Sequence, residues 1–352
     1  MNLKTKVKIL APLKKSFIGH FFRFAKGLKT YRHELVKKRL AEKTPQERRK
    51  DIRRMLLFCY KNFFTPYEYY LLGIDKKTDE EALTYISDCM KDDYCFRLND
   101  PGNKIIFDDK MLTFQKFRKY YKRDMIKYVP GSTECDKNMA GFIEKNRRFI
   151  VKPSNAGRGK GIAIFECANA DEIPSFMRKL QLQYPHGFIA EELIVQSKEI
   201  AVFHPASLNT VRMPTMKIGN EVRIFHPWFR CGQGNAIIDN ASAGGIASLI
   251  NPENGIIIAS GDELGNAFEL HPDTKIAFKG FSIPRWREAI DLVKELSWVV
   301  PNTNYIAWDI ALTDKGWVIV EGNAHGQFLQ QQMLMDKGLK PEVDLICKKL
   351  SI

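Results

Sequence analysis

The spacing of apolar residues changes along the chain from a helical period to a strand period. Residues 9–28 place apolar side chains on one helical face and basic side chains on the other, namely Phe17, Phe21, Phe24 and Leu28 against Lys15, Arg23 and Lys26. This spacing predicts a basic amphipathic helix. Such a helix either adsorbs to an anionic membrane surface or packs on the rest of the protein with its basic face in solvent. The pattern leaves both alternatives open.

Two capping boxes predict further helices in the first quarter of the chain. Thr44-Pro45-Gln46-Glu47 places a capping threonine three residues before a glutamate, with proline at the first helical position. Thr78-Asp79-Glu80-Glu81 repeats the threonine and glutamate spacing. We therefore expect residues 1–95 to be mainly helical.

From about Lys104 onward, short apolar runs alternate with helical patterns, which is typical of an α/β protein. The expected strands cover 105–107, 148–152, 162–165, residues from 188, 210–216, 222–230, 306–312 and 317–323. Helices are expected from Asp109-Lys110 onward and over 283–299. Gly219-Asn220 predicts the turn of an antiparallel hairpin between 210–216 and 222–230.

Composition favours a soluble globular protein of two or three domains. The chain has 352 residues, of which 44% are hydrophobic and 27% charged, which fits a sizeable core and excludes disorder or a collagen-like chain. No apolar run reaches the roughly 18–20 residues that span a bilayer. Basic residues interrupt the N-terminal apolar stretch, so we expect no cleaved secretory signal. The seven scattered cysteines form no Cys-x-x-Cys pair, which indicates reduced thiols in the cytoplasm.

The net charge of +14 is concentrated at the N-terminus. Residues 1–61 hold 19 Lys and Arg against 4 Asp and Glu, whereas the rest of the chain holds 36 against 37. The basic character therefore concerns a partner of the first segment and not the main fold. An anionic membrane surface is the partner we expect. Nucleic acid is a competing partner, but the segment contains no recognised nucleic-acid-binding module.

A glycine-rich loop between two expected strands is the first candidate site. Residues 154–161 read Ser-Asn-Ala-Gly-Arg-Gly-Lys-Gly. Closely spaced glycines let backbone amides approach an anion, and the two basic side chains add positive charge. The sequence is neither a Walker A loop nor a Rossmann turn, because the required motif or following helix is absent. It predicts a flexible lid over phosphates, with a solvated turn as the alternative.

Three oxygen-bearing side chains near the end of the chain form the second candidate site. A three-residue turn at 314–316 would place Asp309 directly opposite Glu321, and Asn323 would project to the same side. Opposed like charges destabilise a sheet unless something compensates them. The two strands contain no nearby cation, so we expect a hard divalent ion. A solvent-facing pair, or a lysine from elsewhere, is the alternative.

Together these sites resemble the ATP-grasp superfamily over about 250 residues, from Lys104 to the C-terminus. The resemblance implies that ATP and Mg²⁺, or Mn²⁺ in its place, are the cofactors, with Asp309, Glu321 and Asn323 as metal ligands. It implies nucleotide contacts from Lys110, Lys152, Ser154, Gly157, Arg158, Gly159, Lys160, Gly161, Glu191, Glu192, Leu193 and Glu199. Among these, Lys110 and Lys152 would contact phosphates, residues 191–193 the purine, and Glu199 the ribose.

A narrower series resembles the sugar-transfer-associated ATP-grasp family. It comprises Ser207-Leu208-Asn209-Thr210-Val211-Arg212, Ile238-Asp239-Asn240, Gly244-Gly245-Ile246, His271-Pro272, Ile283-Pro284-Arg285-Trp286 and Trp308-Asp309-Ile310. By analogy with glutamate ligases of the superfamily, Arg212 and Arg230 would be catalytic residues that steady an acyl phosphate and oxyanion, assisted by Asn240. Asp239 could instead position the amine. Members of the family are linked with bacterial surface polysaccharides.

The expected architecture is an α/β (α+β) ATP-grasp fold whose two subdomains grip ATP. We expect a basic helical region at 1–95, a lid subdomain at 104–190 and a large subdomain with the metal site at 191–352. The expected function is carboxylate–amine ligation through an acyl phosphate, forming an amide on an acidic sugar or related acid in capsular or exopolysaccharide synthesis. The alternatives are a kinase acting on a sugar or lipid-linked intermediate, and a non-catalytic nucleotide-binding protein at the membrane.

The expected partners are small acid and amine substrates, free or carried as nucleotide-sugar or lipid-linked forms. The expected location is the cytoplasm, including the inner face of the cell membrane, which residues 1–61 would contact. The sequence leaves the oligomeric state open.

Overall fold

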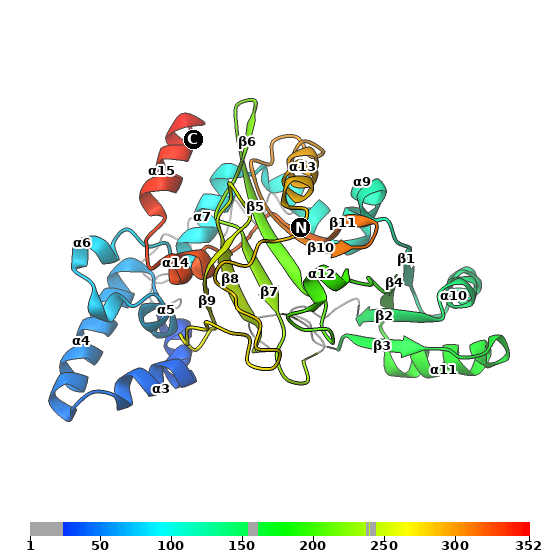
Figure 1. The fold of residues 1–352 in the computed structure, drawn as a ribbon, viewed down its shortest axis with the longest axis horizontal. Coiled ribbons are helices and arrows are strands. Elements are labelled where there is room, and N and C mark those ends of the chain that lie inside the picture. The colour runs from blue at the N-terminus through cyan, green and yellow to red at the C-terminus, as the bar shows by residue number, and fades with distance from the viewer. Residues whose placement is uncertain (1–23, 154–160, 237–238, 240–243) are drawn as a thin grey trace.

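The computed structural model describes residues 24–153, 161–236, 239 and 244–352. Within these residues it contains a helical N-terminal region, a four-stranded sheet and a seven-stranded sheet. Figure 1 shows the N-terminal helices and the small sheet at opposite ends of the molecule, with the large sheet between them. The helix expected over 9–28 lies mostly outside the described residues. Its last part, 24–27, is helical, and the Phe24 ring meets Tyr60 edge to face at 5.3 Å.

The N-terminal region is helical, as the sequence predicts. Its elements are η1 (Leu28–Arg32), α3 (Glu34–Ala41), α4 (Pro45–Asn62), α5 (Pro66–Leu71), η2 (Ile74–Lys76), α6 (Asp79–Ala82) and α7 (Asp88–Leu98). Both predicted capping boxes are present, at Thr44/Glu47 and Thr78/Glu81. A third capping box joins Thr65 and Glu68 at the start of α5. The sequence analysis missed it, although Thr-Pro-Tyr-Glu carries the same signature.

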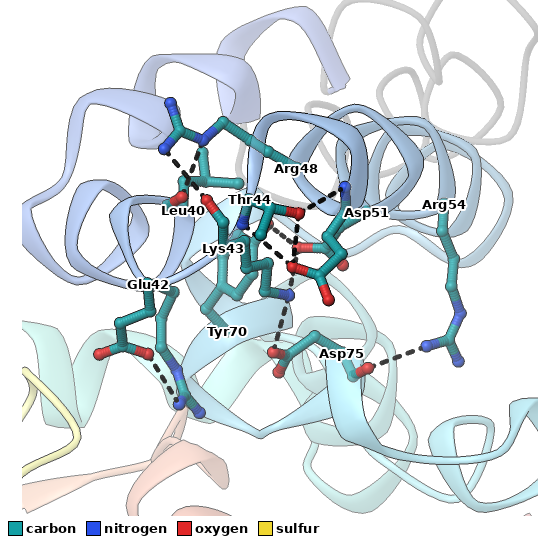
Figure 2. Close-up of polar contacts among 11 residues, drawn as sticks. Leu40, Glu42, Lys43, Thr44, Arg48, Asp51, Arg54, Tyr70 and Asp75 are labelled. Atoms are coloured by element: carbon teal, nitrogen blue, oxygen red, sulfur yellow. Dashed lines mark hydrogen bonds and ion pairs between the residues drawn. The ribbon is translucent and has the colours of Figure 1, made fainter.

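A polar network ties α4 to the turn that follows α5 (Figure 2). Lys43 Nζ lies 2.6 Å from Asp51 Oδ2 and 3.3 Å from Asp75 Oδ2, and the Tyr70 hydroxyl donates to Asp51 at 2.7 Å. Asp51 and Asp75 are thus paired with one half-buried lysine. Such pairing removes most of the desolvation cost of placing charges between helices.

The hydrophobic core of this region extends into the C-terminal part of the chain. Met55, Phe58 and Tyr69 are buried in one cluster with Leu329 of α14 (Leu329–Met335), and Met333 packs against that cluster. The N-terminal region is therefore docked on the body of the protein and shares a core with it.

The small sheet is antiparallel, with strand order β1-β4-β2-β3. Its strands are β1 (Met125–Tyr128), β2 (Arg148–Pro153), β3 (Ala163–Glu166) and β4 (Phe188–Glu192). Helices α10 (Thr133–Lys145) and α11 (Ile173–Gln183) contribute to the core beside it. Phe149 and Val151 of β2 and Phe188 and Ala190 of β4 alternate toward this core. The period of two leaves the intervening residues Lys152 and Glu191 on the other face.

The large sheet has the order β11-β10-β5-β7-β8-β9, with β6 paired to β5. Its strands are β5 (Thr210–Ile218), β6 (Glu221–Ile224), β7 (Trp228–Cys231), β8 (Ile246–Ile250), β9 (Ile257–Gly261), β10 (Tyr305–Thr313) and β11 (Gly316–Asn323). Helix α13 (Trp286–Ser297) contacts β5, β6, β10 and β11. It begins three residues later than expected but buries the predicted face, Trp286, Ile290, Val293 and Leu296.

The remaining elements are η3 (Pro101–Asn103), α8 (Lys104–Asp108), α9 (Lys110–Tyr121), η4 (Ala170–Glu172), α12 (Lys198–Ala201) and α15 (Lys340–Lys349). The strand expected at 105–107 is wrong, because these residues belong to α8. Three apolar residues fit one turn of helix as well as a strand. The Lys104–Asp108 ion pair spans that turn, Phe107 packs on the main core, and Ile105 is 51% exposed.

The single strand expected at 222–230 is two strands. Pro227 has no amide hydrogen for the ladder, and His226 has a positive φ of 48°, so the chain bends between β6 and β7. Each short strand then pairs with a different stretch of β5. The predicted turn at Gly219-Asn220 is present, with Gly219 at φ 60°.

Candidate functional site

A cavity of about 650 Å³ is lined by residues from both sheets and from the N-terminal helices. Eight residues predicted from the sequence line it: Lys110, Lys152, Glu191, Arg212, Arg230, Asp239, Glu321 and Asn323. All but Asp239 come from α9, the small sheet and the large sheet. The fold therefore brings together side chains that lie up to about 200 positions apart in the sequence.

Strands β10 and β11 place Asp309 opposite Glu321, as predicted, but with a different turn. Thr313 pairs with Gly316 around a two-residue turn, and the register shifts by one residue between Asp309 and Ile310. This bulge restores the pairing that a three-residue turn would have produced. Gly316 closes this turn with a positive φ of 104°.

Strands β10 and β11 themselves place no cation beside this pair, as expected, but Arg212 of the neighbouring strand β5 does. Arg212 lies opposite Asp309 on the other neighbouring strand, β5. Its Nε contacts Asp309 Oδ1, and Nη2 of Arg230 lies 3.0 Å from Asp309 Oδ2. The pattern of β10 and β11 does not indicate this contact. Predicting a cation from β5 requires knowing that β5 lies next to β10 in the sheet.

A second acidic group, Asp239, also pairs with Arg230. Arg230 donates to the Thr210 hydroxyl at 2.8 and 3.0 Å, and its Nε lies 3.5 Å from Asp239 Oδ2. The Thr210 hydroxyl in turn donates to Asp239. Arg230 is thus fixed between two carboxylates, Asp239 and Asp309, and its guanidinium borders the cavity. Together with Arg212 it presents positive charge where an anion could bind.

The two opposed carboxylates are held in different protonation states. Burial raises the pKa of Asp309 to about 7, against the lowering effect of Arg212 and Arg230. Burial also acts on Glu321, but Arg212, the hydrogen bond from Asn323 and the contact with Asp309 lower its pKa to about 2. Near neutral pH Glu321 is therefore ionised, while Asp309 keeps its proton in about half of the molecules.

The donor set at the end of β11 fits a hard divalent cation. Asp309 Oδ1 is buried and has no hydrogen bond of good geometry, although Arg212 contacts it. Asn323 donates to Glu321 at 3.2 Å. Carboxylate and amide oxygens are the ligands that Mg²⁺ and Mn²⁺ take in proteins. The part of the chain that the structure describes holds no group of three or more His, Cys, Asp or Glu placed to bind a metal. Asn323 would therefore be needed as the third ligand.

A buried ion-pair network links the small sheet to β11. Lys152 Nζ lies 2.6 Å from Glu191 Oε1, and Arg123 Nη2 lies 3.1 Å from Glu191 Oε2. Arg123 also donates to the main-chain carbonyls of Ile319 and Val320. Although burial opposes it, the charges of Lys152 and Arg123 lower the pKa of Glu191 below its usual value. Lys152 thus lies at the cavity with its ammonium held in place.

The other predicted residues that the structure describes do not line the cavity. Glu192 accepts a hydrogen bond from the Asp124 amide at 3.1 Å, and Leu193 follows directly after β4. Glu199 is exposed on α12 and does not line the cavity. Gly161 has φ +72°, and a Cβ there would lie 2.8 Å from Pro153. Ser154, Gly157, Arg158, Gly159, Lys160 and Asn240 lie outside the described residues.

Two residues that line the cavity, Tyr67 and Lys91, and a neighbour of the cavity residue Glu191, Arg123, carry no signal in the sequence pattern. Arg123 follows α9, whereas Tyr67 and Lys91 belong to the N-terminal helices. Arg123 is only 9% exposed, and an isolated buried arginine cannot be recognised from spacing alone. The Tyr67 and Lys91 contributions depend on how the helical region docks on the large sheet.

Solved structures with similar folds are ligases and synthases of low sequence identity. D-alanine–D-alanine ligase from Helicobacter pylori is 13% identical, with a TM-score of 0.43, and the match covers 70% of this chain and 61% of that one. Carboxyaminoimidazole ribonucleotide synthase from Aspergillus clavatus is 13% identical, with a TM-score of 0.41, and the match covers 70% of this chain and 54% of that one. D-alanine–D-alanine ligase from Bacillus anthracis is 13% identical, with a TM-score of 0.41, and the match covers 70% of this chain and 67% of that one. The matched region thus spans about six-tenths of the first of these proteins. Among curated proteins, none matches the sequence.

A family match settles the relationship that these distant structures leave open. Residues 89–348 match the family described as sugar-transfer associated ATP-grasp. The matched range includes both sheets and every described residue of the predicted site. It leaves out η1, α3, α4, α5, η2 and α6. The chain belongs to the sugar-transfer associated ATP-grasp family.

Proposed function

We propose that the protein is an ATP-dependent ligase that joins a carboxylate to an amine through an acyl phosphate. The observation that carries the proposal is the pair Arg212 and Arg230, fixed by Asp309 at the cavity beside Glu321. Two fixed guanidinium groups next to a site for a divalent cation suit a reaction in which negative charge develops on phosphoryl and acyl oxygens.

The nucleotide would occupy the end of the cavity near the small sheet. Lys152 is held there by Glu191, and half-buried Lys110 begins α9 at the same cavity. Both ammonium groups would bind phosphate oxygens of ATP. Glu191, Glu192 and Leu193 at the end of β4 would border the purine. The glycine-rich loop at 154–161 would contribute phosphate contacts.

Glu321 and Asn323, with Asp309, would hold Mg²⁺ or Mn²⁺. When bound, the cation would neutralise charge on the β- and γ-phosphates. The protein side chains then have separate tasks. Asn323 donates to Glu321 and fixes its orientation, while Asp309 keeps the two arginines in place.

The reaction would proceed in two steps with the arginines as electrostatic partners. A carboxylate oxygen of the acid attacks the γ-phosphorus, and ADP leaves. The amine nitrogen then attacks the acyl carbon, phosphate leaves, and the amine gives up a proton. Arg212 and Arg230 would stabilise the acyl phosphate and the oxyanion of the tetrahedral intermediate. Asn240 would assist them, while Asp239 would position either Arg230 or the amine.

The protein would act in bacterial capsular or exopolysaccharide synthesis, and the reference to sugar transfer in the family's description supports this. The acid would be an acidic sugar or related compound. No helix in the described ranges is long and apolar enough to cross a membrane. The positive charge of residues 1–61 would attract the protein to the inner face of the cell membrane.

Product analysis tests the proposal. Purified protein with Mg·ATP is screened against pairs of acids and amines, including nucleotide sugars, with ADP measured and products identified by mass spectrometry. ADP formation that needs both an acid and an amine, with an amide product, supports the ligase. A phosphorylated hydroxyl product with no amine requirement would show a kinase that uses the same nucleotide and metal residues. Absence of turnover together with tight nucleotide binding would indicate a non-catalytic role.

A further inference from the structure

One wall of the cavity comes from outside the predicted nucleotide and metal sites. Six polar side chains line the cavity there, and we call them the polar wall: Tyr67, Lys91, Glu263, His325, Gln327 and Gln330. Tyr67 lies on α5, before the residues that match the family. The N-terminal helical region therefore forms part of the cavity.

Strand β11 gives the order of the sites along the cavity. At Val320 the strand meets Arg123, which binds Glu191 at the nucleotide end. Val320 and Asn323 are about 10 Å apart along the strand. His325 lies beyond the end of the strand and contacts Asp92 of α7, with 3.8 Å between Nδ1 and Oδ1. The polar wall thus begins where the metal ligands end, on the side away from Glu191.

Buried hydrogen bonds hold the two helices that supply Tyr67 and Lys91. Glu68, next to Tyr67, is 2% exposed and accepts main-chain N–H groups from Thr65 and Asp88, each at 2.6 Å. These amides lie at the starts of α5 and α7. One carboxylate therefore fixes both helix ends relative to each other and sets the position of the wall.

The charges on the wall do not suit an additional phosphate or carboxylate. Lys91 is 9% exposed and already paired with Asp88 at 3.0 Å and Asp92 at 3.4 Å. Glu263 adds a negative charge. Burial, together with Glu263, raises the pKa of the Tyr67 hydroxyl well above its usual value, so Tyr67 remains a neutral donor. Together with Asp88 and Asp92, which pair with Lys91, the wall region holds three carboxylates and one ammonium group, an excess of negative charge beside its hydrogen-bond donors and acceptors.

We propose that the polar wall binds the sugar ring of the attacking substrate, a hydroxyl-rich ring that carries the amine. Several hydroxyl groups can be matched by the hydroxyl, carboxylate, imidazole and amide groups of the wall. The acidic excess favours an ammonium group over a second anion. An aliphatic amine would leave these polar groups unpaired, which costs binding energy. This inference rests on the proposed function and names the class of its nucleophile.

Saturation-transfer NMR on the full chain tests the inference without turnover. The probes are glucosamine and hexylamine, each added with MgCl₂ and a non-hydrolysable ATP analogue. We expect saturation of the glucosamine ring protons and at least five-fold less for hexylamine. Tyr67→Phe and Gln330→Leu should each reduce the glucosamine signal at least five-fold. Tyr31→Phe, at an exposed tyrosine outside the cavity, is the matched control and should leave the signal unchanged.

Nucleotide affinity, measured on the same variants, separates binding by the wall from a structural role. Affinity for the ATP analogue within two-fold of the unmodified protein supports a separate sugar site. The inference is overturned if glucosamine gives no signal, if hexylamine binds equally well, or if both variants retain the full signal. Loss of nucleotide binding in parallel with glucosamine would overturn it as well. Failure of the ligase proposal is visible elsewhere, as absent acid- and amine-dependent ADP formation.

Discussion

Arg230 of β7 and Asp309 of β10 meet across the intervening strand β5, with 3.0 Å between Nη2 and Oδ2. Arg212 of β5 contacts the other oxygen of the same carboxylate. One buried carboxyl group therefore contacts two arginines. At pH 4.5 Asp309 is protonated and neutral like asparagine, but the asparagine amide turns an N–H₂ donor toward one of these guanidinium groups and leaves it without an acceptor. We therefore expect Asp309→Asn to lower the free energy of unfolding at pH 4.5 by about 2 kcal/mol.

Urea denaturation followed by circular dichroism measures this change. Asp291→Asn is the matched control, because Asp291 forms an exposed ion pair with Arg287 on α13. Exposed pairs contribute about 0–1 kcal/mol, so the control should stay close to the unmodified protein. If Asp309→Asn changes stability no more than the control, the buried pairs do not hold the two arginines.

The raised pKa of Asp309 predicts an unusual dependence of stability on pH. Burial raises this pKa from 3.8 to about 7, so the folded protein keeps a proton that the unfolded chain loses. The stability that this group contributes is full below about pH 4 and is lost as pH rises through 7, by up to about 1.4 kcal/mol per unit. Glu321, with its pKa lowered to about 2, acts in the opposite direction, and only below about pH 4.5.

Stability measured from pH 4.5 to 8 without metal or nucleotide tests this assignment. Other titrating groups contribute equally to the unmodified protein and to Asp309→Asn, so the difference between their curves isolates Asp309. We expect the difference in unfolding free energy to shrink as pH rises toward 8. Parallel curves would show that Asp309 is ionised throughout.

The opposition of Asp309 and Glu321 could be predicted because the hairpin has a strong strand pattern on both sides of its turn. The predicted three-residue turn is wrong, because the turn has two residues. A bulge between Asp309 and Ile310 shifts the register by one residue and so brings Asp309 opposite Glu321. In a regular antiparallel hairpin, the two residue numbers of every pair add up to the same value, so the turn alone determines which residues face each other. A bulge changes that value. The predicted pairing is therefore correct only because a bulge, which the sequence pattern does not predict, offsets the shorter turn.

Arg212 and Arg230 were recognised as candidate residues, but their relation to Asp309 was not. That relation depends on β10 pairing with β5 and β5 with β7, across large separations in the chain. Period and turn signals are local, so they identify strands without fixing their order. The same limit applies to Tyr67 and Lys91, whose place at the cavity depends on the docking of helices.

Glu321→Gln and Asn323→Ala test the metal assignment. Glu321→Gln removes the charge of one metal ligand, and Asn323→Ala removes the oxygen of another. Neither removes a large buried side chain, so the fold should remain intact. We expect ATP turnover to fall at least 100-fold and the melting temperature to change by only a few degrees. Steady-state ADP formation and thermal unfolding measure the two effects. Turnover within two-fold of the unmodified protein would refute the assignment.

Lys152→Met tests the nucleotide end of the cavity. It removes one of the two cations that lower the pKa of Glu191, so that pKa should rise. The stability that Glu191 contributes is present above about pH 4.5 and lost as pH falls, so the variant should lose it at higher pH. We also expect at least ten-fold weaker binding of an ATP analogue.

Titration calorimetry and acid denaturation measure these two effects of Lys152→Met. Lys145→Met is the control, because Lys145 pairs with Asp124 near the same sheet and is 70% exposed. Equal nucleotide affinity in both variants would contradict a phosphate contact from Lys152.

Removal of residues 1–23 tests the membrane proposal with little risk to the fold. This segment contains six basic and no acidic residues. Cutting after Arg23 keeps Phe24 and Thr30, which contact Tyr60 and the Tyr67 amide. Each basic residue near an anionic surface adds about 1 kcal/mol, so we expect the truncated protein to bind phosphatidylserine vesicles at least 100-fold more weakly.

Vesicle sedimentation at 50 and 300 mM salt measures this binding, with neutral phosphatidylcholine vesicles as the control surface. Salt should weaken the binding of the full chain, because screening shortens the reach of surface charges. Arg53→Glu reverses a charge on the exposed face of α4 and separates a contribution of the folded helices from that of residues 1–23. Unchanged vesicle binding after truncation, with Arg53→Glu lowering it, would place the membrane contact on α4. Unchanged binding in both variants would contradict an electrostatic contact through residues 1–61.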